Sequence, residues 1–157
     1  MKIEAHDTNG KVYTQELPDS AAAALDSLAE NNLSRTDVQR LIDNLSISAD
    51  AKAILNSIAK TTVVVGNKII QIGTKILQFV RDIFKAYPKA TFGLILGLVL
   101  SALVAAIPVI GFLFGGLILP VAAAFGLVSG WMEDMKDSAL LIKIQAVTAN
   151  FSPLAAN

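Results

Sequence analysis

The side chains that could carry out chemistry are few and scattered along this chain. There is no Cys, and the single His, His6, lies on an expected strand with no second metal ligand at a useful spacing. Glu133, Asp134 and Asp137 could chelate a hard cation, but acidic residues after an apolar segment more often cap and solubilise a helix end. No glycine-rich phosphate loop follows a strand. We therefore expect no enzymatic activity, no metal site and no cofactor.

The overall composition indicates a membrane protein and excludes an electrostatic nucleic-acid binder. Thirteen basic side chains balance 13 acidic ones, so no net positive charge is available to attract a phosphate backbone. Hydrophobic residues make up 54% of the chain and charged residues 17%. Ordinary globular proteins have roughly 45–50% and about 25%, respectively.

The clearest feature is a long gap in the charges. Residues 90–132 are 43 consecutive uncharged positions, and one membrane span needs roughly 20 apolar residues. We predict a transmembrane or re-entrant helical hairpin here, with both termini on the same side, which is cytoplasmic by default. Ile107-Pro108 is the expected breakpoint and Gly115-Gly116 the competing one. The alternative interpretation is a pair of buried core helices in a soluble protein.

Small residues and aromatic flanks support the hairpin. Tyr87, Lys89 and Trp131 are expected anchors at the membrane interface. Small residues at four-residue intervals predict close helix packing, within the hairpin or between subunits. They are Gly93, Gly97, Ser101 and Ala105 in the first half, and Ala122, Gly126 and Gly130 in the second. Gly66 and Gly73, one heptad apart, are expected to serve the same purpose on the preceding helix.

Residues 51–89 are predicted to form a long, basic, amphipathic helix. They carry seven basic side chains and one acidic one. Polar residues recur at alternating three- and four-residue spacing, which places them on one narrow face. These residues are Lys68, Gln71, Lys75, Gln78, Asp82 and Lys85. The stripe could line a pore or contact lipid headgroups, and the same pattern also suits packing in a helical bundle.

The two ends of the chain are predicted to be small accessory parts. Residues 1–50 carry four basic and nine acidic side chains and read as a soluble acidic head. The turn Thr8-Asn9-Gly10-Lys11 predicts a β-hairpin of strands 2–6 and 12–16. Short helices are expected to begin near Asp19, Ser34 and Ser48. The core of this head is small, so it is expected to rest on a partner or on the basic helix. Residues 133–157 are predicted to form a short helix and an apolar tail that docks within an assembly.

The chain is therefore predicted to be mainly α-helical, and two functions remain open. In plan, residues 50–150 resemble the pore-forming domains of colicins, in which amphipathic helices surround a hydrophobic hairpin. The first function is a protein that oligomerises and permeabilises a bilayer, which the small-residue intervals and the amphipathic helix favour. The alternative is a non-conducting, membrane-anchored structural subunit of a multiprotein complex. The expected partners are a lipid bilayer, other copies of the chain and, for the second function, other subunits.

Overall fold

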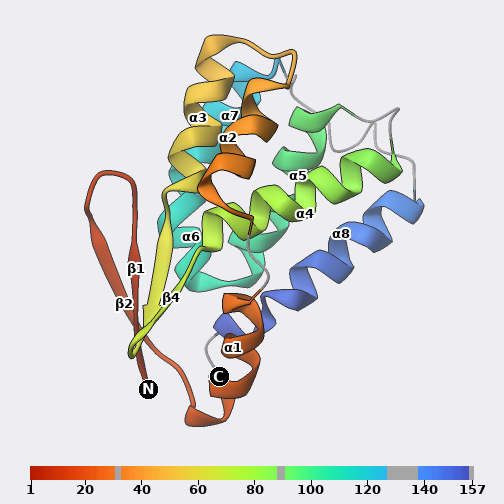
Figure 1. The fold of residues 1–157 in the computed structure, drawn as a ribbon. Coiled ribbons are helices and arrows are strands. Elements are labelled where there is room, and N and C mark those ends of the chain that lie inside the picture. The colour runs from red at the N-terminus through yellow and green to blue at the C-terminus, as the bar shows by residue number, and fades with distance from the viewer. Residues whose placement is uncertain (31–32, 88–90, 127–137, 156–157) are drawn as a thin grey trace.

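The fold is mainly helical, with a small antiparallel sheet at one side (Figure 1). It is known from a computed structural model that describes residues 1–157 except 31–32, 88–90, 127–137 and 156–157. The sheet has four strands in the order β2-β1-β3-β4. Helices from the whole length of the chain pack beside it around a single apolar core.

The N-terminal hairpin forms where the sequence predicts it. β1 (Lys2–His6) and β2 (Val12–Glu16) pair antiparallel, with Ala5 opposite Tyr13. Gly10 has φ 84°, a conformation that glycine adopts without a steric penalty. The Asp7 carboxylate accepts hydrogen bonds from the backbone N–H groups of Asn9 and Lys11, at 2.9 and 2.8 Å. Because these contacts are local, the sequence was sufficient to locate the hairpin.

Two of the first three helices begin at the predicted serine caps, whereas the first has Ala21 at its N-cap and no side-chain cap. A short 3-10 turn, η1 (Asp19–Ala21), leads into α1 (Ala22–Ala29). α2 (Arg35–Asp43) and α3 (Ala49–Ala59) follow, and their N-cap residues are Ser34 and Ser48. Each serine hydroxyl accepts a hydrogen bond from the backbone N–H three residues on, which satisfies an otherwise free donor.

The predicted single helix over residues 51–89 is wrong. Its place is taken by α3, the strands β3 (Thr62–Val65) and β4 (Lys68–Ile70), and α4 (Ile72–Ala86). Residues 61–65 are all β-branched and favour a strand. The two-residue turn Gly66-Asn67 then reverses the chain, with Gly66 at φ 58°. β3 pairs with β1, so this internal hairpin completes the sheet begun at the N-terminus.

The described part of the uncharged run folds into a series of short helices. α5 (Phe92–Ala106) is followed by α6 (Pro108–Phe114), the 3-10 turn η2 (Gly115–Leu117) and α7 (Ile118–Ala124). Both expected breakpoints are used, since Pro108 begins α6 and Gly115 begins η2. α5 contacts α4, α6, α7 and α8, and its inward-facing leucine, isoleucine and valine side chains are buried among them.

The predicted membrane hairpin is therefore not formed. Among the helices that the structure describes, none is long and apolar enough to cross a bilayer. α5 has 15 residues and a length of about 22 Å, short of the ~30 Å hydrocarbon core. The predictions of a transmembrane protein, of membrane localisation and of a pore are thus contradicted. The physical reason is that α4, α6, α7 and α8 contact the most apolar helix, α5, and cover its side chains.

The C-terminal segment packs onto its own chain. α8 (Ser138–Asn150) buries Leu140, Ile144 and Val147, and a final 3-10 turn, η3 (Ser152–Leu154), follows it. The Phe151 ring is fully buried and meets Phe79 of α4 edge-on, with ring centroids 5.6 Å apart. The tail thus contributes Phe151 and Leu154 to the core of its own fold.

Candidate functional site

The structure brings no catalytic or metal-binding constellation together within the residues it describes. His6 lies on β1 with Glu4 beside it, and its Nε2 is 3.5 Å from the Glu4 carboxylate. In that part of the chain, no group of three or more His, Asp or Glu side chains is close enough to hold a metal ion. Glu133, Asp134 and Asp137 fall outside the described residues.

The predicted polar stripe is divided between two elements, a strand and a helix, and the residue that joins them. Lys68 is on β4, where it pairs with Asp26 of α1, and Gln71 precedes α4. The other four are on α4, where Asp82 and Lys85 are exposed and Gln78 is half-buried. A single lining face from Lys68 to Lys85 is therefore absent, because a strand and a helix present their side chains with different periods.

Lys75 is the unusual member of this set, because it is buried, with only 6% of its surface exposed. Its Nζ donates a hydrogen bond of 2.7 Å to the backbone carbonyl of Glu30, just beyond the last turn of α1. Burial lowers the pKa of Lys75, and the nearby Glu30 charge opposes that shift. A cation at the C-terminal end of a helix is favoured by the helix dipole. Lys75 thus ties α1 to α4 and does not face solvent.

Two of the predicted packing glycines lie at tight contacts between elements. A Cβ on Gly73 would lie 1.6 Å from the Ile58 carbonyl oxygen, at the end of α3. A Cβ on Gly93 would lie 2.5 Å from the Phe125 ring, which follows α7. Gly73 therefore allows two backbones to approach closely, and Gly93 allows the Phe125 ring to lie directly against the backbone of α5.

The other predicted packing and anchor residues occupy varied positions. Gly97 is buried in α5, Ser101 and Ala122 are half-buried, and Ala105 is exposed. Gly66 and Gly126 have no heavy atom near the position of a Cβ, and both have positive φ, so they are turn residues and not packing residues. Tyr87 is half-buried after α4. Gly130, Lys89 and Trp131 lie outside the described residues.

The most distinctive surface lies along α6, η2 and α7, and sequence reasoning missed it. Exposed positions recur there at intervals of three or four residues, as expected for one side of a helical path. We call this surface the uncharged face. It comprises Pro108, Phe112, Gly115, Gly116, Leu119, Pro120 and Ala123. None of these residues carries a charge or a side-chain hydrogen-bonding group, so their side chains form no hydrogen bonds with water.

Two large apolar side chains dominate the uncharged face. Leu119 is 81% exposed and Phe112 is 54% exposed. The Phe112 ring stacks on Tyr13 of β2, with centroids 5.4 Å apart and planes 12° from parallel. Lys11 Nζ lies 5.3 Å from the Tyr13 ring centre on the neighbouring turn. The face therefore has an apolar centre and a basic side chain beside its edge at the sheet.

No protein-family model, no curated protein and no solved structure matches this chain.

Proposed function

We propose that this chain is a structural subunit that self-associates through the uncharged face. The observation that carries the proposal is the exposure of Leu119 and Phe112 within a stripe that has no polar side chain. Single exposed apolar residues are ordinary, but a larger exposed apolar surface is typical of an interaction site. Burying a side chain of this size stabilises an interface by roughly 1.5–3 kcal/mol.

A second copy is the occupant that the charges favour. In a two-fold symmetric dimer each residue near the axis meets its own counterpart, so a charge there would face a like charge. The uncharged face carries no charge, and 13 basic side chains balance 13 acidic ones over the whole chain. Neither local nor long-range repulsion therefore opposes the pairing of two copies.

The experiment is sedimentation velocity over a hundredfold range of protein concentration. The native chain is expected to shift from monomer to dimer as the concentration rises. Leu119→Asp places a charge opposite its own counterpart, and we expect it to weaken dimerisation at least about tenfold. Ile142→Asp is the matched control, because Ile142 is 65% exposed on α8 and lies outside the uncharged face. This control should dimerise like the native chain.

Three results would overturn the proposal. The native chain could stay monomeric over the whole range, or Leu119→Asp could dimerise as well as the native chain. The third is a native monomer that sediments with lipid vesicles through Leu119, which would make a bilayer the occupant of the face. Circular dichroism of each variant would confirm that the fold is retained.

A further inference from the structure

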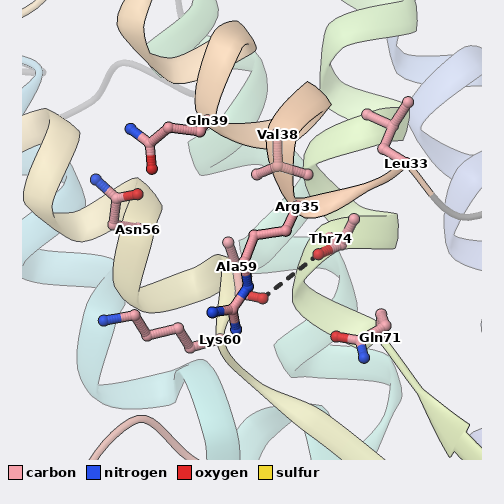
Figure 2. A pocket seen from close by; sticks show the side chains of 9 residues that line it. All are labelled: Leu33, Arg35, Val38, Gln39, Asn56, Ala59, Lys60, Gln71 and Thr74. Atoms are coloured by element: carbon pink, nitrogen blue, oxygen red, sulfur yellow. Dashed lines mark hydrogen bonds between the residues drawn. The ribbon is translucent and has the colours of Figure 1, made fainter.

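A groove between α2, α3 and the start of α4 has the character of a binding site. It encloses a cavity of about 260 Å³, and Figure 2 shows the side chains that line it. Arg35 reaches from the start of α2 toward α3, where Lys60 follows the last turn. Gln39 and Asn56 lie on one side of the groove, and Gln71 and Thr74 lie on the other.

The charged side chains that line this groove are all basic. Arg35 and Lys60 both line it, and no acidic side chain does. Within the part of the chain that the structure describes, no ion pair joins either cation to a carboxylate. The nearby Arg40, by contrast, faces Asp37 at 4.0 Å on the exposed side of α2. The groove therefore offers two positive charges that no described carboxylate neutralises.

The remaining polar groups add hydrogen-bond donors to this charge. The amides of Gln39, Asn56 and Gln71 can each donate, and the Arg35 guanidinium carries five N–H groups in a fork that suits paired oxygens. The Thr74 hydroxyl already donates to the Ala59 carbonyl at 3.4 Å, which fixes it against the wall. Such an excess of donors over acceptors favours a ligand that is rich in oxygen.

The non-polar part of the wall favours an organic group beside the anion. Leu33, Val38 and Ala59 supply apolar surface next to the two cations. A drug-sized ligand occupies a cavity of roughly 300–1,000 Å³, so this groove suits a smaller molecule. The first turns of α2 and α4 border the groove and favour an anion, whereas the last turn of α3 contributes a dipole of the opposite sign.

We propose that this groove binds a small phosphate monoester, with its phosphate between Arg35 and Lys60. A phosphate monoester carries about −1.5 to −2 charges at neutral pH, which matches the two cations better than a carboxylate does. The amide groups complete the hydrogen bonds of the phosphate oxygens, and the organic part lies on the apolar wall. This site is independent of the uncharged face and of the proposed self-association.

The test uses three probes with the full chain, followed by backbone amide chemical shifts in NMR titrations. Phenyl phosphate is expected to shift groove residues and to bind more tightly than inorganic phosphate, which lacks the apolar group. Benzoate, with one negative charge, is expected to bind most weakly. Arg35→Gln and Lys60→Gln should each weaken phenyl phosphate binding about tenfold or more. Arg40→Gln, which removes a cation outside the groove, should leave the affinity for phenyl phosphate unchanged.

Several outcomes would overturn the proposal. One is the absence of shifts at groove residues with millimolar phenyl phosphate. Another is an equal loss in Arg40→Gln and Arg35→Gln, which would indicate non-specific attraction to surface charge. Benzoate binding as tightly as phenyl phosphate would reject the phosphate in favour of any aromatic anion. Unchanged amide spectra outside the groove would show that the variants fold.

Discussion

α5 and the segment from α6 to α7 have nearly the same amino-acid composition, but they differ in how much of their surface is exposed to solvent. Both come from the charge-free run, and both are rich in leucine, isoleucine, valine, alanine and glycine. α5 contacts helices on several sides, and most of its residues are buried. α6, η2 and α7 bury one side and present Phe112 and Leu119 to solvent on the other. The number of neighbouring elements, and not the hydropathy, decides which part of the run is core.

This contrast teaches how a sequence can resemble a membrane hairpin without forming one. A membrane span and a fully enclosed core helix require the same side chains, because both avoid water on every side. The two differ in what surrounds them, and for α5 that cover comes from α4, which precedes it directly in the chain, and from α8, which lies near the C-terminus. The second half of the run lacks such complete cover, which leaves the uncharged face.

The largest effect on the free energy of unfolding is expected when a carboxylate is placed in the first half of the charge-free run, and the second half provides the comparison. Leu96→Asp buries a charge at a position with no exposed surface and should lower the free energy of unfolding by more than about 4 kcal/mol. Leu119→Asp places the same group at an exposed position and should change it by less than about 0.5 kcal/mol. Urea unfolding followed by circular dichroism measures both. Equal losses in the two variants would remove the distinction between core and face.

A smaller effect on stability is expected from adding one methyl group to a glycine in each half of the charge-free run. Gly93→Ala on α5 would force its Cβ into the Phe125 ring, and we expect a net loss of stability of about 1–2 kcal/mol. Gly111→Ala on α6 would place its Cβ 3.4 Å from the Val104 carbonyl oxygen, which is an ordinary contact. That variant should gain up to about 1 kcal/mol from the better helix propensity of alanine. A destabilised Gly111→Ala alongside a neutral Gly93→Ala would contradict the packing described for the two halves.

The smallest effect is a pH dependence of the free energy of unfolding, and it arises from Lys75 on α4, one of the helices that cover α5. The pKa of buried Lys75 on α4 is lowered from 10.5, whereas in the unfolded chain it keeps its ordinary value. Between the lowered pKa and 10.5, the unfolded chain binds more protons, so this residue makes the free energy of unfolding rise with pH. Lys75→Met should lose this rise, while Lys85→Met, exposed on the same helix, should keep it. Urea unfolding at several alkaline pH values tests this, and equal slopes in all three proteins would show that Lys75 is not effectively buried.

Local signals in the sequence predicted several elements correctly. The Asn9-Gly10 turn, the serine caps at Ser34 and Ser48, and the break at Pro108 depend on residues close together in the chain. Gly66-Asn67 after a β-branched run is a signal of the same kind, but the polar spacing from Lys68 onward favours a helix and conceals it. That helical spacing holds only from the start of α4.

The uncharged face and the phosphate groove could not be read from the sequence in the same way. The groove joins Arg35, Lys60 and Gln71 from separate elements, and their proximity depends on how α2, α3 and α4 pack. The exposure of Leu119 depends on which helices cover α7, and hydropathy alone predicts burial. The one available signal was the spacing of Pro108, Phe112, Leu119 and Ala123 along a broken helical path, which is weak without the surrounding fold.

The central claim is that the charge-free run is divided between an enclosed helix and an exposed face that pairs with a second copy. The most direct measurement is the rate of maleimide labelling of Leu119→Cys as a function of protein concentration, since the native chain has no Cys. We expect fast labelling in dilute solution and protection at concentrations where the dimer forms. Leu96→Cys should label slowly at every concentration. Slow labelling of Leu119→Cys at all dilutions would contradict the exposed face, and fast labelling at all concentrations would contradict self-association.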